Sequence, residues 1–334
     1  MKDKTFKNKT ILVTGGTGSF GKVFIKKVLE YGVKKVIVYS RDEFKQFNMS
    51  NMPEFSQYKN KISYIIGDVR DKGRLMQAME DVDYVVHAAA MKQVPACEYN
   101  PFEAIKTNVF GAENVIEAAI ANKVEKVVAL STDKACAPIN LYGATKLCSD
   151  KLFIAANTYP NNKKTRFAIV RYGNVAGSRG SVIPYFQKLV SEGASEVPIT
   201  DIRMTRFWIK MEQAVSMVVD SLESMSGGEL YVKKIPSMKI IDLAKAVNPK
   251  IKIKEIGIRP GEKIHEQMIT ASDAPNTIDM GDFYIILPQI ALPETTEKYA
   301  DIKRVPADFE YNSGDNELWF TIDEMKDLIK EMEK

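Results

Sequence analysis

Two short clusters in the middle of the chain carry side chains suited to acid–base chemistry: Thr132-Asp133-Lys134, and Tyr142 with Lys146. Tyr142 and Lys146 are four residues apart, so on a helix they share one face, with Cβ atoms about 6 Å apart. An ammonium that close favours phenolate, and we expect it to lower the Tyr142 pKa from about 10 toward neutrality. Such a tyrosine can take a proton from a substrate hydroxyl while hydride leaves the same carbon. The Tyr-x-x-x-Lys spacing alone is common on amphipathic helices, so its meaning depends on its surroundings.

Alternating strands and helices are expected to position these clusters. An apolar run at residues 127–130 precedes the first cluster and is typical of a buried strand. Helices of about 10 to 18 residues separate the expected strands, which indicates a doubly wound (Rossmann) α/β fold with a parallel sheet. Ligands bind such sheets at the carboxyl ends of the strands, where most of the motifs fall. The strands are expected at residues 10–14, 35–39, 62–66, 84–87, 126–131 and 167–171.

A glycine-rich turn follows the first expected strand and leads into a helix expected over residues 22–31. The first, fourth and seventh residues of this turn are glycine. Between a strand and a helix N-terminus, such a turn brings backbone N–H groups onto a pyrophosphate, and the helix dipole adds to the attraction. The sequence therefore predicts a dinucleotide site formed by Gly15-Gly16-Thr17-Gly18-Ser19-Phe20-Gly21.

The end of the second strand indicates which dinucleotide is bound. A site for the unphosphorylated cofactor usually has an acid here, which binds the ribose 2′-hydroxyl. Instead Ser40 and Arg41 end the strand, and Lys45 follows one turn later. A hydroxyl and two cations suit a 2′-phosphate, so NADP is expected over NAD. Asp42 and Glu43 lie close enough to leave NAD open.

Three further positions are expected to contact the cofactor. Asp68 and Val69 follow the third strand, where the carboxylate can accept a hydrogen bond from the adenine amino group. Ala88 and Ala89 follow the fourth strand, and their small side chains let a flat ring or a ribose lie against the backbone. Lys92 opens the next loop and can reach either cofactor or substrate.

Beyond residue 171 the alternating pattern of strands and helices weakens, and loops that contain arginine follow. Guanidinium forks suit phosphate, so Arg206 and Arg259 are candidates for a substrate diphosphate, with surface salt bridges as the alternative. Asn174 and Glu262 join them as candidate substrate-binding residues. We expect an NADP-binding Rossmann domain over 1–172 and mainly a smaller C-terminal substrate-binding lobe over 173–334, with some segments free to return to the first domain.

Composition excludes several classes of function. The 334 residues are 45% hydrophobic and 27% charged, which is ordinary for a globular protein. The net charge of +4 is small and dispersed, so neither nucleic acid nor a membrane surface is an expected partner. No apolar run approaches the roughly 18 residues of a transmembrane helix. The three cysteines have no metal-like spacing, so no metal and a reducing, cytoplasmic setting are expected.

These motifs together resemble the extended short-chain dehydrogenase/reductase family over nearly the whole chain. Within that family the chain is most similar to the inverting UDP-N-acetylglucosamine 4,6-dehydratases of pseudaminic acid synthesis. One departure is Cys136-Ala137, which interrupts the commonest pattern between the two clusters. The closer match is carried by Tyr39-Ser40-Arg41-Asp42-Glu43, Ala88-Ala89-Ala90-Met91-Lys92-Gln93-Val94-Pro95, Ser131-Thr132-Asp133-Lys134-Ala135 and Pro138-Ile139-Asn140-Leu141-Tyr142-Gly143-Ala144-Thr145-Lys146.

The resemblance implies a reaction and a role for each clustered residue. Retaining sugar-nucleotide dehydratases have Asp-Glu where this chain has Asp133-Lys134, whereas inverting ones have Asp-Lys. On UDP-N-acetylglucosamine, Tyr142 with Lys146 would deprotonate the C4 hydroxyl during oxidation by NADP, and Thr132 would hydrogen-bond the C4 oxygen. The C5 proton is then acidic, so Lys134 would remove it and Asp133 would protonate the departing C6 hydroxyl. Hydride returns to C6 and C5 is inverted; how these two residues divide the acid and base roles stays open.

Other readings share parts of this site. A UDP-sugar 4-epimerase would use the same cofactor site and stop after the redox step at C4, and a retaining 4,6-dehydratase would keep the C5 configuration. A ketone reductase would consume NADPH. A dinucleotide-sensing regulator on the same fold typically lacks the tyrosine or the lysine, and this chain has both. The resemblance also implies a homo-oligomer, a dimer or larger.

Overall fold

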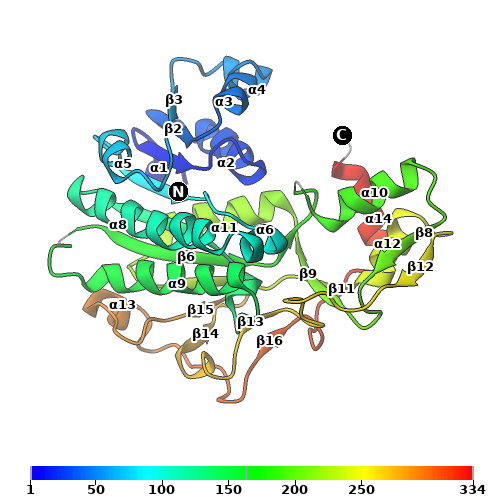
Figure 1. The fold of residues 1–334 in the computed structure, drawn as a ribbon. Helices are drawn as coiled ribbons and strands as arrows, with labels where there is room; N and C mark the ends of the chain where they lie inside the picture. The colour runs from blue at the N-terminus through cyan, green and yellow to red at the C-terminus, as the bar shows by residue number, and fades with distance from the viewer. Residues whose placement is uncertain (1, 163, 179, 333–334) are drawn as a thin grey trace.

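A nine-stranded sheet forms the centre of the protein in the computed structural model, which describes residues 2–162, 164–178 and 180–332 (Figure 1). Its strand order is β14-β15-β10-β6-β5-β4-β1-β2-β3, and the seven strands from β10 to β3 pair in parallel. β15 pairs antiparallel with β10, and β14 pairs antiparallel with β15 at the edge of the sheet. The strands are β1 (Thr10–Thr14), β2 (Lys35–Ser40), β3 (Ile62–Ile66), β4 (Tyr84–His87), β5 (Lys126–Thr132), β6 (Arg166–Tyr172), β10 (Leu230–Lys233), β14 (Thr277–Asp279) and β15 (Phe283–Ile286).

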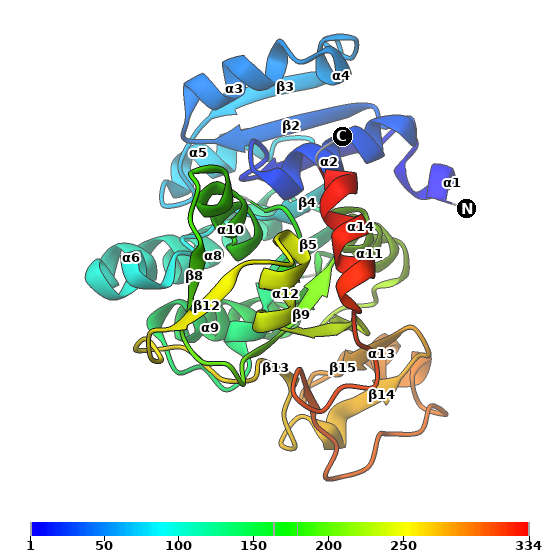
Figure 2. The same cartoon turned by 90° about the vertical axis from the view of Figure 1, so that its right-hand side faces the viewer.

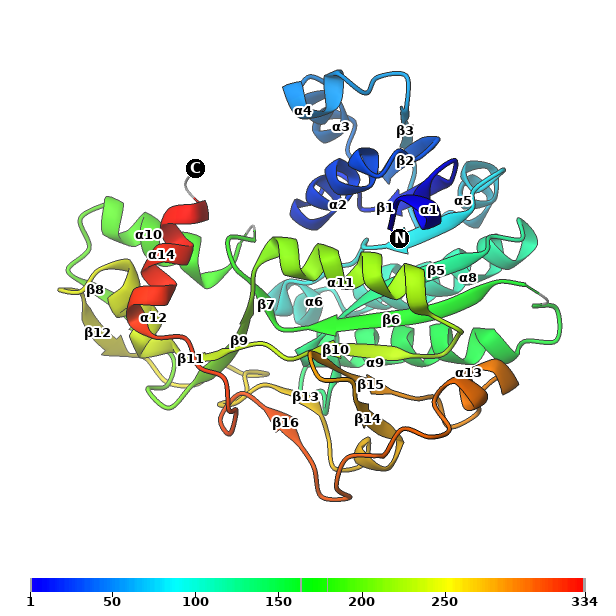
Figure 3. The same ribbon diagram turned by 180° about the vertical axis from the view of Figure 1, so that it is seen from behind.

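Helices cover both faces of this sheet, which confirms the predicted doubly wound α/β fold. α8 and α9 pack together on one face, while α2 and α11 pack together on the other, as the two opposite views show (Figures 1 and 3). All five residues of β1 are buried, as expected for a parallel sheet covered on both sides. The helices around the sheet are α1 (Lys2–Phe6), α2 (Ser19–Glu30), α3 (Glu43–Ser50), α4 (Pro53–Ser56), α5 (Lys72–Ala78), α6 (Val94–Tyr99), α7 (Pro101–Ile105), α8 (Gly111–Ala121), α9 (Leu141–Ala155), α11 (Met211–Ser224) and α13 (Pro293–Lys298).

A second, smaller apolar cluster holds together a lobe beside the carboxyl ends of the strands (Figure 2). Trp208, Leu243 and Leu328 are buried in it. Its final helix, α14, packs on α12, so the amphipathic end of the chain covers the lobe. The lobe contains α10 (Val182–Ser191), α12 (Ile240–Val247) and α14 (Ile322–Met332), with β7 (Asn174–Val175), β8 (Glu196–Ile199), β9 (Thr205–Ile209), β11 (Ser237–Lys239) and β12 (Lys252–Glu255). β13 (Gln267–Ile269) and β16 (Tyr311–Asn312) form a separate antiparallel pair.

The chain passes between these two parts more than once after Tyr172. α11 packs on β5 and β6, and β10, β14 and β15 lie in the central sheet, although all four elements come after the first lobe residues. Among the described residues, no helix is long and apolar enough to span a membrane, and no group of three or more His, Cys, Asp or Glu side chains could hold a metal ion.

Candidate active site

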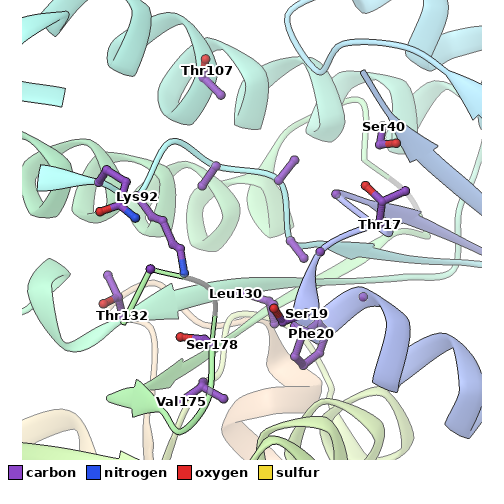
Figure 4. A pocket seen from close by; sticks show the side chains of 18 of the residues that line it. Thr17, Ser19, Phe20, Ser40, Lys92, Thr107, Leu130, Thr132, Val175 and Ser178 are labelled. Carbon is purple, nitrogen blue, oxygen red and sulfur yellow. The ribbon is translucent and has the colours of Figure 1, made fainter. Parts of the chain in front are cut away.

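A cavity of about 630 Å³ opens at the carboxyl ends of the parallel strands (Figure 4). Its volume lies in the range of about 300–1,000 Å³ typical of small-molecule sites. Figure 4 shows Thr17, Ser19 and Phe20 on one side and Lys92 reaching in from the other. Most of the sequence-predicted residues line it: Gly15, Thr17, Gly18, Ser19, Phe20, Gly21, Ser40, Arg41, Lys45, Val69, Ala88, Ala89, Lys92, Thr132, Lys134, Tyr142, Lys146 and Asn174. Asp68, Asp133, Arg206, Arg259 and Glu262 are not among the lining residues.

The glycine turn leaves the space that a dinucleotide needs. Gly15 has φ 68°, and a Cβ there would lie 3.0 Å from the Ala89 backbone. A Cβ on Gly21 would lie 2.5 Å from the carbonyl oxygen of Gly16, so this glycine lets α2 pack against the turn. α2 begins at Ser19, three residues earlier than predicted, and no side chain caps it. Its first backbone N–H groups therefore face the cavity mouth, where a pyrophosphate would accept from them.

At the end of β2, the cation Arg41 is followed by Asp42, whose carboxylate is already paired with Lys45. Asp42 caps α3 by accepting from the Lys45 backbone N–H at 2.9 Å, and the Lys45 ammonium lies 2.7 Å from its other oxygen. These contacts lower the pKa of Asp42. The guanidinium of Arg41 is largely exposed and lies 3.6 Å from Asp68 Oδ2. The carboxylate best placed to bind a ribose is thus already engaged.

Asp68 lies beside the cavity rather than in its lining. Its Oδ2 accepts from Arg70 Nη2 at 2.7 Å, and although burial opposes the shift, the contacts with Arg70 lower the Asp68 pKa. Its backbone carbonyl accepts from the Tyr39 hydroxyl at 2.9 Å. Tyr39 and Gly67 line the cavity here and were not predicted as site residues, because their roles depend on a ring packed over a glycine.

The two candidate catalytic clusters meet because α9 packs tightly on the turn after β5. That turn is a single 3₁₀ turn, Asp133–Ala135. Asn140 caps α9 by accepting from the Gly143 N–H at 2.8 Å. A Cβ on Gly143 would overlap the carbonyl of Lys134, so only glycine lets the helix approach this closely. This contact brings Tyr142 beside Lys134.

Tyr142 differs from the expectation in its proton affinity. Burial raises its pKa to about 12, and Lys134 and Thr132 only partly oppose that effect. The expected lowering by Lys146 is absent. Burial has the opposite effect on the cation: it lowers the pKa of Lys146, and Asp150, one turn further along α9, only partly opposes this shift. Without bound ligands, desolvation of the phenolate outweighs the nearby charge.

Lys134 is held between two buried carboxylates. Its Nζ lies 3.2 Å from Asp133 Oδ1 and 3.4 Å from Glu266 Oε1. Burial by itself would lower the pKa of Lys134, but the two carboxylates outweigh burial and raise this pKa above its ordinary value. Asp133 is fully buried, and burial raises its pKa despite the neighbouring ammonium. The Thr132 hydroxyl donates to Asp133 Oδ1 at 2.8 Å. Glu266 was missed by sequence reasoning, since nothing local marks it.

The arginine loops do not reach the cavity lining. Arg206 is buried, and its Nη1 donates to the carbonyls of Thr205 and Ile264 at 2.7 and 3.0 Å. Arg259 is exposed and donates through Nε to Glu262 Oε1 at 2.9 Å, so these two predicted substrate residues pair with each other.

Comparison with known proteins agrees with this geometry. The family model described as polysaccharide biosynthesis protein matches residues 11–288. A Campylobacter jejuni protein named UDP-N-acetylglucosamine 4,6-dehydratase (inverting) is 53% identical over 98% of this chain and 99% of its own length. A Rickettsia canadensis protein named UDP-glucose 4-epimerase is 44% identical over 84% of this chain and 83% of its own. The solved structure of Pen from Bacillus thuringiensis is 39% identical, with a TM-score of 0.88 over 98% of this chain and 99% of that one. The chain therefore belongs to the polysaccharide biosynthesis protein family and has the fold of the extended short-chain dehydrogenases/reductases.

Proposed function

We propose that the protein is an inverting 4,6-dehydratase that converts UDP-N-acetylglucosamine to UDP-2-acetamido-2,6-dideoxy-β-L-arabino-hex-4-ulose. The observation that carries this proposal is the contact of Asp133 with Lys134 beside Tyr142 at the end of β5. The 53% identity to the Campylobacter jejuni dehydratase, over nearly the full length of both chains, supports the same substrate.

Three parts of the cavity fit a nicotinamide dinucleotide. The glycine turn and the alanines after β4 leave the backbone accessible, because no large side chain fills the space there. The end of β2 provides cations. Gly15, Gly18 and Gly21 would hold the pyrophosphate, and Ala88 and Ala89 would let the flat parts of the cofactor approach the backbone. A bound NADP supplies the hydride acceptor for C4 and the hydride donor for C6, so no external reductant is consumed.

The first proton transfer falls to Tyr142. It takes the proton of the C4 hydroxyl as that carbon is oxidised. Lys134 favours the phenolate in the structure, and Lys146 is proposed to assist once the ligands are bound. Because burial raises the Tyr142 pKa to about 12, these cations are needed to make the phenolate accessible near neutral pH. Thr132 would hydrogen-bond the C4 oxygen.

The elimination falls to Asp133 and Lys134. Oxidation at C4 places the C5 proton α to a ketone and makes it acidic. Lys134 must first lose its own proton, and Asp133 Oδ1 lies 3.2 Å away to receive it. That transfer turns the ion pair into a neutral amine beside a carboxylic acid. The amine then takes the C5 proton, and the acid protonates the C6 oxygen, which leaves as water. A raised Asp133 pKa suits the donor role.

The direct test is incubation of the protein with NADP and UDP-N-acetylglucosamine. The product is expected to be lighter by one water, with NMR showing inversion at C5. An unchanged mass would favour an epimerase, the name carried by relatives at 44% identity. Retention at C5 would indicate a retaining dehydratase, and stoichiometric NADPH consumption would indicate a reductase.

NADP is the proposed cofactor because Arg41 is largely exposed at the cavity edge while Asp42 is occupied by Lys45. Arg41→Ala is expected to weaken NADP binding by about tenfold or more, since a charge-assisted contact with phosphate contributes about 1.5–3 kcal/mol. NAD binding should change little. Titration calorimetry with each dinucleotide measures both, and Lys72→Ala on the surface of α5 is the control. Equal losses for the two dinucleotides would contradict the assignment.

Three further features stay predictions from the resemblance: a role in pseudaminic acid synthesis, a cytoplasmic location and assembly into a homo-oligomer. The three free cysteines are consistent with a reducing compartment. Asn174 and Lys92, which line the cavity, are the proposed sugar-nucleotide contacts. Arg206, Arg259 and Glu262 could serve the diphosphate only after leaving their present partners.

A further inference from the structure

Glu266 comes from a distant part of the chain and lies against the catalytic turn. It directly precedes β13, which packs on the turn Asp133–Ala135. Its side chain is almost completely buried. Oε1 lies 3.4 Å from Lys134 Nζ and 3.7 Å from Arg206 Nε, and Oε2 is buried without a hydrogen-bond partner among the described residues.

Four buried or half-buried charges alternate in sign around this point. Asp133, Lys134, Glu266 and Arg206 follow one another, with successive contacts of 3.2, 3.4 and 3.7 Å. We call this set the charge ladder. Lys134 is the member that lines the cavity, and a quarter of its side chain is exposed. Glu266 and Arg206 therefore act on the substrate through this lysine.

Backbone hydrogen bonds, which do not involve the carboxylate, hold Glu266 in place. Its backbone N–H donates to Ser313 Oγ at 2.9 Å, and its carbonyl accepts from the Ser313 N–H at 2.8 Å. Arg206 is likewise anchored by two backbone carbonyls. Asp133 already gives the Lys134 ammonium one carboxylate partner. Burying a second carboxylate with one unpartnered oxygen destabilises the folded protein. We therefore expect its role to lie in its contact with the Lys134 ammonium.

We propose that Glu266 is a positioning residue that holds the Lys134 ammonium against Asp133 and controls when this lysine gives up its proton. The proposal rests on the proposed function and deepens it. A lysine that is always charged cannot act as base, and one that is always neutral would let the C5 proton be removed out of step with oxidation at C4. Two flanking carboxylates keep Lys134 charged until its proton moves to Asp133.

The charged groups around Lys134 and Glu266 define the direction in which the Lys134 pKa should change when the Glu266 charge is removed. Asp133, Tyr142, Arg206 and Lys92 act on Lys134 together with Glu266. Removing the Glu266 charge leaves Arg206 uncompensated beside the lysine, and both effects favour the neutral amine. The proton of Lys134 should then be lost at lower pH.

Glu266 itself is faced by cations from three elements. Lys134, Arg206 and Lys263 lower its pKa, although burial opposes them. It is therefore a carboxylate at neutral pH, and Glu266→Gln removes a charge rather than only a hydrogen bond. The shape of the side chain is nearly unchanged.

The test measures Lys134 directly, without relying on turnover. Acetic anhydride labelling of the intact protein across a pH series, read at Lys134 by peptide mass spectrometry, gives the pH at which its amine becomes reactive. We expect Glu266→Gln to move this onset to lower pH by about one unit or more, as loss of an opposite charge at this distance does. Glu266→Asp, which keeps the charge at a longer distance, should give an intermediate onset, and it answers the question alone if Glu266→Gln fails to fold.

The control is Glu229→Gln, which removes an equally buried carboxylate that caps the turn before β10 and does not line the cavity. Its Lys134 onset should equal that of the wild type. An unchanged onset in the Glu266 variants would overturn the inference. Failure of the wild type to remove water from UDP-N-acetylglucosamine would instead overturn the proposed function, so the two failures are distinguishable. In an active wild type, the limb of the pH–rate profile that reports Lys134 should shift with the labelling onset.

Discussion

Lys134→Ala is expected to lower the rate of water loss from UDP-N-acetylglucosamine by about a thousandfold, because general acid–base groups contribute about 10²–10⁴-fold. The substitution removes the amine that lines the cavity beside Tyr142 and leaves Asp133 without the partner 3.2 Å away. Mass spectrometry of the product over time measures the loss. Oxidation at C4 should survive in part, since Tyr142 and Lys146 are unchanged, and the absorbance of reduced nicotinamide reports it.

Two variants separate the proton-transfer role of Lys134 from its charge. Lys134→Arg keeps a cation at the turn but cannot become a neutral base at neutral pH, so it should be as inactive in elimination as the alanine variant. Lys245→Ala, on the surface of α12, should leave the rate unchanged. Dehydration at the wild-type rate by Lys134→Ala would show that this lysine is not the base.

Tyr142→Phe is expected to block the oxidation at C4, the step before elimination. The rates of nicotinamide reduction, C5 proton exchange and water loss should each fall by about 10²–10⁴-fold. Without the phenol the C4 hydroxyl keeps its proton and no ketone forms, so C5 does not become acidic. Exchange of the C5 proton with deuterated solvent, followed by NMR, should therefore vanish together with water loss and nicotinamide reduction. Lys134→Ala, in contrast, should lose exchange and elimination while retaining some reduction.

The control for this variant is Tyr84→Phe, which removes the hydroxyl of a buried tyrosine on β4 that contacts the Thr5 carbonyl, away from the cavity. Normal C5 exchange in Tyr142→Phe would remove the tyrosine from the first step. Because burial raises the Tyr142 pKa, the wild-type rate of C4 oxidation should rise with pH over the alkaline range, and this rise should be lost in the phenylalanine variant.

The positions of Tyr142 and Lys134 in the fold explain why their two steps are expected to be linked. Tyr142 is on α9 and Lys134 is on the turn that α9 touches at Gly143, so one contact sets the spacing between the two side chains. A catalytic tyrosine and an elimination couple placed on separate loops would have to be brought together anew in each turnover. Here their spacing is set by a helix packed against a strand end.

Local pattern in the sequence determined the parallel sheet and the dinucleotide turn. The strands at residues 10–14, 62–66 and 84–87 have the bounds that the sequence predicts, because parallel strands are short, mainly apolar runs between turns. The helical segment from Pro101 to Ala121 consists of three consecutive pieces, with a π-helical turn at Lys106–Phe110. There the Asn108 side chain is buried and bonds both the N–H and the carbonyl of Met91, a long-range contact that no local pattern reveals.

Only the tertiary structure decided the electrostatics of the site. The sequence indicated which side chains could carry acid, base and hydride chemistry, because spacing on one helix and adjacency after one strand are local properties. It could not place Glu266 beside Lys134, some 130 residues away, or bury Arg206 behind it. Nor could it show that burial would outweigh the charge of Lys134 and raise the pKa of Tyr142. Proton affinities depend on solvent exclusion and on neighbours from the whole fold, and both arise only when the chain is packed.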